Sequence, residues 1–565
     1  MPSARRVLPM LVVLVLLSCG GPAPPPSSAV KDPRCAGFEL DVERVWNVEA
    51  KAEIKSRFIA TGVVYAERMY ESVVTQMDDA TRDWVMLRES LCTDCLVRGL
   101  VPREVYAPVS LCYDTALIRQ RTAITLFRSA DAVTVEKAFE VFLDISDRLE
   151  SCQRDAARAL YQRDAANPDQ EAVRDAEAKA AEAELALELG RKEGAARAAE
   201  ESAKAAEKVQ SGRIRAGVLF VEGRSARDDA RYDEATAKIE QAVALSRESG
   251  DKVTEGNCLV QLGWTKSDQG EYREALDDFD QAEALYVTVL DRGSTELGAL
   301  QVNRGNTYNL LAEFNMALEC FEQALDIFTK AYGDDSPYVA NIFNHIGLAW
   351  DGLGQYEKAL GHYGQSLEIY RKVFGDGHPR MAVVLNNIGL AWRHLGKFEK
   401  AIEYYEQALR LDRAARGDAH PAVARDLNNI GVSWRHLGEY EKALGYYDQA
   451  LAIYRKVYGE EHPLVATSLN NIGLAWKKLG QYEKALGYYE QSLEISKKVY
   501  GGEHPLVAAA LTNIGAVWDS ADKCDKALEY FEDALRIRQK MLPADHPDLK
   551  TVSDWVDVCK EKLGR

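Results

Sequence analysis

Long apolar runs are scarce in this sequence, and positive charge is outnumbered by negative charge. The 565 residues include 70 Lys and Arg against 88 Asp and Glu, which gives a formal net charge of −18. Because binding to a nucleic-acid backbone requires clustered Lys and Arg, this balance argues against a nucleic-acid partner. The apolar run at residues 7–17 is too short to span a bilayer, since a membrane helix needs about 20 apolar residues.

Signatures of catalysis are also missing. The sequence contains no Gly-rich phosphate loop and neither of the tripeptides His-Arg-Asp and Asp-Phe-Gly, which excludes phosphorylation by protein-kinase chemistry. Cys92 and Cys95 have the two-residue spacing of redox dithiols, but the βαβ context that would support this function is absent. The sequence therefore predicts a protein that is not an enzyme, with no catalytic residue, no cofactor and no metal site.

The first residues have the features of a lipoprotein signal. Arg5 and Arg6 precede the apolar run, and residues 16–19, Leu-Leu-Ser-Cys, close it. This tetrapeptide closely resembles the lipobox of bacterial lipoproteins, in which cleavage precedes the cysteine and the thiol is acylated. The resemblance implies a signal peptide over residues 1–18 and a diacylglyceryl-modified Cys19; the alternative is a buried cysteine placed there by chance.

The residues after Cys19 predict a tether. Prolines at positions 22, 24, 25 and 26 prevent a helix, so residues 19–34 should lift the folded part away from a membrane surface. Gly20 stands where Asp would indicate inner-membrane retention in the best-known lipoprotein sorting rule. The resemblance therefore favours the outer membrane of a bacterial envelope, with the protein facing the periplasm or the cell surface.

Residues 35–155 combine apolar residues at helical spacing with five cysteines, which predicts a small helical bundle. In an exported chain this density of cysteine favours disulfides. The positions suggest the pairings Cys35–Cys152, joining the ends of the bundle, and Cys92–Cys112, closing its central hairpin. Spacing alone leaves the connectivity open.

The same segment contains a Cys, then Trp46, then Cys-rich positions followed by Arg98 and Cys112. In this order it resembles the extracytoplasmic region that precedes tetratricopeptide repeats in certain bacterial transmembrane Ser/Thr kinases. Here a signal peptide stands in place of the kinase domain, so the resemblance extends only to the extracytoplasmic part.

A period of 42 residues dominates the C-terminal two thirds of the chain, which indicates a repeat architecture. Glycines recur with this period at Gly263, Gly305, Gly347, Gly389, Gly431, Gly473 and Gly515, alanines recur from Ala275 to Ala527, and prolines recur from Pro337 to Pro547. Gly223, Tyr232 and Ala235 extend the pattern upstream with a 40-residue step.

Within one period, residues 387–408 carry a small residue, an aromatic residue, a turn glycine, a second aromatic residue and alanines in the order of the tetratricopeptide consensus. The repeats resemble those of kinesin light chains in their 42-residue length, His-Pro loop and Asn-Asn pair. The resemblance implies an all-α solenoid of helical hairpins in a right-handed superhelix. Hairpins of this kind must stack to bury their apolar faces.

The predicted organisation is therefore a bundle at 35–155 and a helical connector at 156–215, in which Ala195 and Ser202 fit a degenerate hairpin. An array of eight repeats follows at 216–547, and a capping helix closes it at 548–565.

Histidine also recurs with the repeat, which raises the question of metal binding. Stacked repeats place successive copies about 10 Å apart, whereas zinc–nitrogen bonds are about 2 Å long, so we expect a loop or capping role. These histidines are His378, His420, His462, His504 and His546. The remaining cysteines, Cys258, Cys320, Cys524 and Cys559, are predicted to be buried structural residues.

Two ladders of asparagine follow the first helix of each hairpin, whose solvent face lines the concave side in this family. Their amides can satisfy the backbone of an extended peptide, or can hold adjacent helices together, and the sequence does not decide between these roles. The first ladder is Asn344, Asn386, Asn428 and Asn470; the second is Asn303, Asn387, Asn429, Asn471 and Asn513.

One turn later the array carries a basic strip: Arg393 and His394, Arg435 and His436, Lys477 and Lys478. In an acidic protein such a strip indicates an acidic peptide or protein segment as ligand; the alternative is a solvated face paired with neighbouring Glu.

The sequence thus predicts a scaffold that binds a protein partner in its groove and meets the membrane only through the lipid anchor. The alternative function is a sensor or assembly subunit of an envelope signalling complex that recognises its ligand through the bundle.

Overall fold

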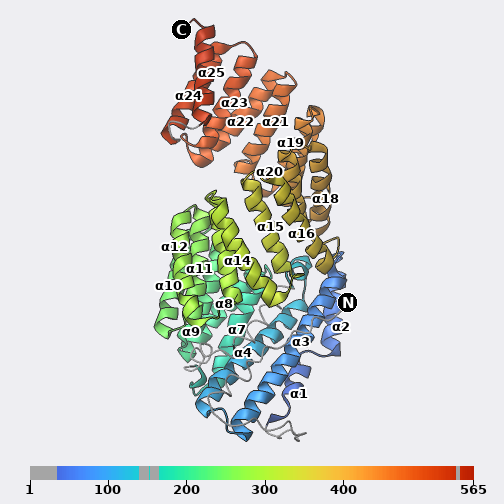
Figure 1. The fold of residues 1–565 in the computed structure, drawn as a ribbon, viewed down its shortest axis with the longest axis vertical. Helices are drawn as coiled ribbons and strands as arrows, with labels where there is room; N and C mark the ends of the chain where they lie inside the picture. The colour runs from blue at the N-terminus through green and yellow to red at the C-terminus, as the bar shows by residue number, and fades with distance from the viewer. Residues whose placement is uncertain (1–34, 139–140, 142–151, 153–163, 542–546, 565) are drawn as a thin grey trace.

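The computed structural model describes residues 35–138, 141, 152, 164–541 and 547–564. The predicted signal peptide, Cys19, the tether at 19–34 and His546 lie outside the described residues. Over the described ranges the regular structure is helical and contains no strand, which confirms the predicted all-α fold (Figure 1). None of the helices in these ranges is both long and apolar enough to cross a membrane.

The N-terminal bundle is built around one long helix, α3. Its apolar residues recur every three or four positions, so that Met69, Val73, Met77 and Trp84 lie on one face and are almost fully buried. The bundle consists of α1 (Phe38–Glu43), α2 (Val48–Ala60), α3 (Ala66–Cys92), the π-helical turn η3 (Thr93–Val97) and α4 (Arg103–Phe127). The predicted disulfide-bearing helical bundle is confirmed.

The predicted cysteine pairing is wrong, although the four cysteines are the ones predicted to pair. The disulfides are Cys35–Cys92 and Cys112–Cys152, with Cα atoms 5.6 and 5.7 Å apart. Cys92 ends α3 and meets the start of the bundle. Cys112 is the tenth residue of α4 and lies about 13 Å beyond the start of that helix. It is therefore too far along α4 to close the loop between α3 and α4.

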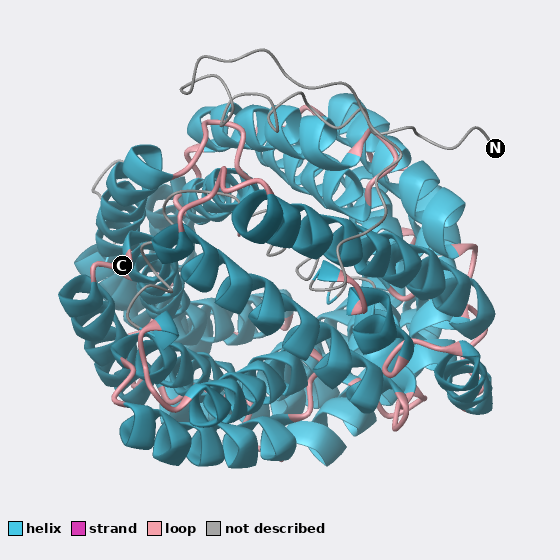
Figure 2. Ribbon diagram, turned by 90° about the horizontal axis from the view of Figure 1, so that it is seen from below, coloured by secondary structure: helices cyan, strands magenta, loops and turns pink. Residues whose placement is uncertain are grey.

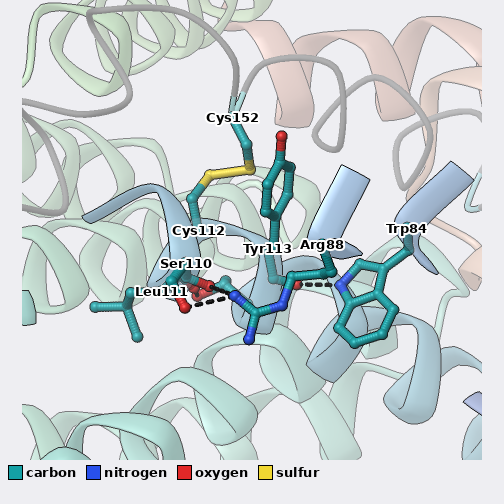
Figure 3. Close-up of a disulfide and its surroundings, with 8 residues drawn as sticks. Trp84, Arg88, Ser110, Leu111, Cys112, Tyr113 and Cys152 are labelled. Carbon is teal, nitrogen blue, oxygen red and sulfur yellow. Dashed lines mark hydrogen bonds between the residues drawn. A yellow bond between two sulfur atoms is a disulfide. The ribbon is translucent and has the colours of Figure 1, made fainter. Parts of the chain in front are cut away.

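Buried polar contacts hold α3 against α4 beside the second disulfide (Figure 3). The indole of Trp84 donates to the carbonyl of Tyr113 at 2.7 Å, and the guanidinium of Arg88 donates to the carbonyl of Ser110 at 3.3 Å. Arg88 also pairs with Asp114 at 3.1 Å, so this buried charge is compensated.

From α7 onward the described chain consists of antiparallel helical hairpins, each packed on the next. Their helices are α7 (Gln170–Glu188), α8 (Lys192–Val209), α9 (Gly212–Asp228), α10 (Tyr232–Ser249), α11 (Lys252–Gln269), α12 (Tyr272–Val289), α13 (Thr295–Leu310), α14 (Phe314–Tyr332), α15 (Pro337–Gly352), α16 (Tyr356–Phe374), α17 (Arg380–His394), α18 (Phe398–Arg416), α19 (Pro421–His436), α20 (Tyr440–Tyr458), α21 (Pro463–Lys478), α22 (Tyr482–Tyr500), α23 (Pro505–Ser520) and α24 (Cys524–Met541), followed by α25 (Pro547–Lys562). Because the packing is continuous from α7 to α25, the domain limits given above stay predictions.

The conserved spacing of glycine within the repeat has a steric reason. In the hairpin of α17 and α18, a Cβ atom on Gly389 would lie 2.6 Å from the ring of Tyr405, which is fully buried. Only glycine lets the two helices approach this closely. Gly396, at φ 70°, ends the first helix in the left-handed conformation that closes the turn.

The array curves so that the first helix of each hairpin lies on the inner side. First helices of neighbouring hairpins, such as α13 with α15 and α21 with α23, pack on each other more closely than the second helices do. In a curved stack the shorter spacing lies inside, and viewed along the long axis the helices form a ring (Figure 2). The first helices therefore form the concave surface.

The bundle contacts the array at two places far apart in sequence. At one end α4 packs on α7, and Arg119 pairs with Glu184 at 2.7 Å. At the other end the ring of Tyr65 lies 4.6 Å from that of His378, and Glu136 pairs with Arg416 at 3.4 Å. The bundle thus bridges the beginning and the middle of the superhelix (Figure 1).

Candidate peptide-binding groove

The repeated histidines are helix caps. Each of His420, His462 and His504 directly precedes the proline that begins a first helix. Its Nδ1 accepts the backbone N–H of the residue after that proline, at 3.1 to 3.2 Å. The rings of His462 and His504 also stack on Tyr458 and Tyr500, with centroids 4.1 and 4.2 Å apart. The capping role predicted for these histidines is confirmed.

His378 occupies the equivalent position in an earlier repeat, where the bundle covers the stacked ring. Its ring is fully buried between Phe374, at 4.1 Å, and Tyr65 of the bundle, at 4.6 Å. Burial, followed by the field of Arg416, lowers the pKa of His378 to about 3. The imidazole is therefore neutral and serves the packing of the bundle on the array.

The two asparagine ladders are joined to each other. The amide of Asn387 donates to that of Asn344 at 2.9 Å, and Asn429 donates to Asn386 at 2.8 Å. The same bond joins Asn471 to Asn428 and Asn513 to Asn470. The amides therefore connect first helices of neighbouring repeats, as one of the two predicted roles requires.

These bonds leave part of the second ladder open to a ligand. Asn387 is half-buried and lies on the accessible side of α17, where Val383 and His394 are exposed. One N–H and the carbonyl of an amide remain available after a single donated bond. Both predicted roles are thus compatible at this position, and peptide contact stays a prediction.

The basic strip lies on the concave side, in the last turns of α17, α19 and α21. Helix C-termini favour cations, but among the described residues no carboxylate lies within 4.0 Å of the charged groups of Arg393, Arg435 or Lys477, which are half-buried. Burial, then Lys478, lowers the pKa of Lys477. The predicted pairing with neighbouring Glu is absent at these three cations.

The histidines of the strip have closer partners. His394 lies 3.3 Å from the carboxylate of Asp351, whereas His436 stacks on Phe398 with centroids 4.8 Å apart. Burial lowers the pKa of His436, and Arg435 and Arg393 lower it further. Positive groups on neighbouring first helices therefore act on one another along this surface, and Asp351 and Asp519 are the acidic groups nearest to it.

Tyrosine hydroxyls beneath the strip were not identified from the sequence as site residues. The hydroxyls of Tyr405 and Tyr489 are buried and have no hydrogen-bond partner among the described residues, and Tyr447 lies beside Arg435. Burial raises the pKa of Tyr405 to about 12, with Arg393 opposing the rise. These neutral hydroxyls thus lie buried inside the hairpins, beneath the cations.

The sequence matches the tetratricopeptide repeat family over residues 222–286, 296–372, 352–414, 380–433, 423–497 and 476–540, which together cover more than half of the chain. The chain belongs to the tetratricopeptide repeat family. A comparison with curated proteins finds no match.

Several solved structures are similar to this chain at low sequence identity. BtubC (BKLC) from P. vanneervenii is 21% identical, with 44% of this chain and 94% of that chain covered and a TM-score of 0.35. A putative kinesin light chain from Podosopora anserina is 22% identical, with 36% and 97% covered and a TM-score of 0.33. The apo quorum sensor NprR from B. thuringiensis is 18% identical, with 64% and 98% covered and a TM-score of 0.49.

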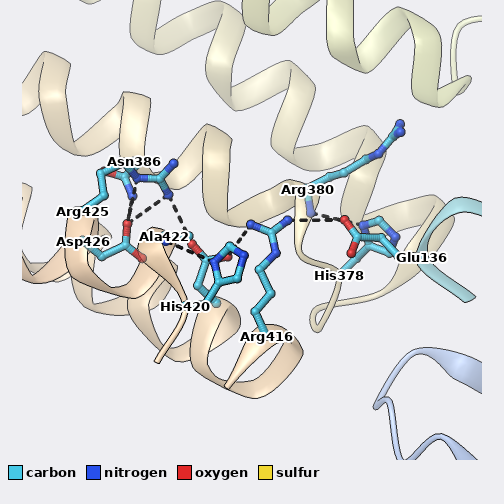
Figure 4. A network of polar contacts seen from close by, with 10 residues as sticks. Glu136, His378, Arg380, Asn386, Arg416, His420, Ala422, Arg425 and Asp426 are labelled. Atoms are coloured by element: carbon cyan, nitrogen blue, oxygen red, sulfur yellow. Dashed lines mark hydrogen bonds and ion pairs between the residues drawn. The ribbon is translucent and has the colours of Figure 1, made fainter. Parts of the chain in front are cut away.

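One joint of the tetratricopeptide array departs from the others (Figure 4). Between α17, α18 and α19 lie the buried carboxylates Asp412 and Asp426, where the preceding repeat carries Tyr370 and Val384. Arg425 pairs with both, at 3.2 and 3.0 Å, and Arg416 pairs with Asp412 at 3.4 Å and with Glu136 of the bundle. This polar joint, formed by Asp412, Asp426, Arg425 and Arg416, therefore lies where the bundle contacts the array. Aligning the repeats with one another would reveal its two aspartates in the sequence.

The cysteines differ in state. Cys92 is bonded to Cys35, so it is not paired with its near neighbour Cys95, which is buried and free. Cys258, Cys320, Cys524 and Cys559 are free and buried as predicted. The resemblances of the N-terminal segment to a lipobox and to a kinase extracytoplasmic region stay predictions.

Proposed function

We propose that this protein is a non-enzymatic scaffold, exported and lipid-anchored, that binds an extended acidic segment of a partner protein on the concave side of its tetratricopeptide array. The observation that supports this function most directly is the set of Arg393, Arg435 and Lys477. They are half-buried cations on successive first helices, without a carboxylate within 4.0 Å among the described residues.

An acidic ligand would supply what this surface lacks. The two guanidinium groups of Arg393 and Arg435 offer planar, bidentate donors for carboxylates. The open amides of Asn387 and Asn429, one turn earlier, can pair with a peptide backbone. Side-chain charge would thus select the ligand while the asparagines accept any extended backbone.

Export and anchoring rest on the sequence at Cys19 and receive support from the bundle. The disulfides Cys35–Cys92 and Cys112–Cys152 are typical of an oxidising compartment. Intact mass measurement of protein purified from the bacterial envelope is expected to show an acylated Cys19 at the mature N-terminus, with loss of membrane attachment in Cys19→Ser. An unmodified, unprocessed chain would contradict the anchor.

A direct test of the groove uses fluorescein-labelled hexaglutamate and hexaglutamine peptides with the full chain in fluorescence polarisation. Changing Arg393, Arg435 and Lys477 together to Gln should weaken hexaglutamate binding at least tenfold. The matched control changes three exposed cations on second helices, Arg410→Gln, Lys456→Gln and Lys497→Gln, which removes the same net charge. Equal weakening by both triple variants would reject a defined groove and indicate unspecific attraction.

The bundle is the competing recognition element. A surface depression of about 520 Å³ lies on it, lined by charged residues that include Arg82, Glu89 and Arg98. If a partner captured from detergent-solubilised envelope is retained by the groove variant but lost when Arg82 and Arg98 are changed to Gln, the protein acts as a sensor or assembly subunit through the bundle.

A further inference from the structure

Two free cysteines meet at the C-terminal end of the array. Cys524 is the first residue of α24, and Cys559 lies near the end of the capping helix α25, which packs on α24. Their Sγ atoms and a carboxylate oxygen of Asp519 all lie within 4.8 Å of one another. Both thiols are buried, with 8% and 1% of the residue exposed.

We propose that Cys524 and Cys559 form a third disulfide under oxidising conditions and thereby staple the capping helix to the last hairpin. The reaction is a dithiol–disulfide exchange with a small external disulfide. The two thiols lose two protons and two electrons, the Sγ–Sγ bond forms, and the external disulfide is reduced to two thiols.

The position gives this bond a structural purpose. The last hairpin of a solenoid has no following repeat to cover its apolar face, so the capping element must stay in place. Here α25 covers α24 with Val552, Val556 and Cys559, and Lys562 pairs with Asp519 at 2.8 Å. A covalent bond between Cys524 and Cys559 would join the start of α24 to the end of α25 and prevent the capping helix from separating.

The surroundings favour a disulfide over a metal site. Burial raises the pKa of the Cys559 thiol to about 11, with Cys524 and Asp519 adding to the rise. Metal binding requires thiolates, which are costly here, and the carboxylate of Asp519 is already paired with Lys562. Closing the disulfide needs no lasting charge in this buried place.

The test uses the full chain incubated with a mixture of oxidised and reduced glutathione, then alkylated with N-ethylmaleimide in denaturant and digested with trypsin. Cleavage at the flanking lysines yields residues 524–526 and 551–560. We expect these two peptides to be recovered as one disulfide-linked species, while Cys258 and Cys320, buried in α11 and α14, remain alkylated and serve as internal controls.

Hydrogen exchange of residues 551–560 provides the second measurement, and should slow at least tenfold after oxidation in the wild type but not in Cys559→Ser. Recovery of both cysteines alkylated, or each carrying glutathione, would overturn the proposal. So would protection of both thiols in the reduced protein by added Zn²⁺ that Asp519→Asn abolishes, since the cluster would then be a metal site.

Discussion

Asp426 is a buried carboxylic acid whose ionisation should lower stability strongly. Its side chain is fully buried, Oδ1 accepts from Asn386 and Arg425, and Oδ2 is buried without a hydrogen-bond partner among the described residues. Burial raises the pKa of Asp426 from 3.8 to about 7; Asp412 adds to the rise, whereas Arg425 and Asn386 oppose it. If Oδ2 carries the proton of a neutral carboxylic acid, it does not need a hydrogen-bond donor beside it.

The sign of the pH dependence follows from this raised pKa. Between pH 4 and pH 7 the folded chain keeps the proton and the unfolded chain has released it, so the free energy of unfolding falls as pH rises through this window and is flat above it. The difference between 3.8 and about 7 corresponds to about 4 kcal/mol at high pH. Asp426→Asn removes this loss, because an amide stays neutral and can still accept from Asn386.

We expect Asp426→Asn to unfold at a higher temperature than the wild type at pH 8.5 and at nearly the same temperature at pH 4.5. The measurement is thermal unfolding by circular dichroism, with hydrogen exchange of α18 and α19 to locate the effect, because repeat arrays unfold in parts. His420, whose pKa is lowered mainly by burial, titrates in both proteins, so its effect cancels.

The matched control is Asp418→Asn, which changes the same charge on a side chain that is 89% exposed, and should leave the pH profile unchanged. A variant less stable than the wild type at pH 8.5 would refute the reasoning. It would show that the ion pair of Asp426 with Arg425 stabilises the folded protein by more than the burial of the ionised carboxylate costs.

Three further predictions concern packing within the array. Gly431→Ala should destabilise α19 and α20 by about 1–3 kcal/mol in urea unfolding, since its Cβ would lie 2.7 Å from a buried tyrosine ring; Gly445→Ala, with no atom within 4 Å of its Cβ, should be neutral or stabilising. Arg416→Gln should loosen the bundle by about 1 kcal/mol, seen as faster hydrogen exchange at the start of α3, and unchanged exchange would show that this ion pair does not hold it. Asn387→Ala should cost about 1 kcal/mol through the lost amide bond between first helices, and would weaken hexaglutamate binding only if the asparagines also contact peptide.

The sequence predicted the features that are repeated, because each repeat imposes the same steric requirement. Gly389 against Tyr405 and the capping by His462 follow from local spacing and recur in register. The disulfide pairing depends instead on where α3 ends in space, which the separation of 57 positions between Cys35 and Cys92 does not reveal. Likewise, contact between Glu136 and Arg416 depends on the superhelical curvature accumulated over 280 residues.

The second contact between bundle and array also constrains how the gene can change in length. Repeats between α7 and α18 lie within a loop closed by the bundle, so inserting or deleting a hairpin there would move Arg416 and His378 out of register with Glu136 and Tyr65. The hairpins from α19 to α24 lie outside that loop, so a hairpin can be gained or lost there without disturbing the closure. Duplication of repeats should therefore be tolerated in the C-terminal part of the chain and opposed in the part that the bundle spans.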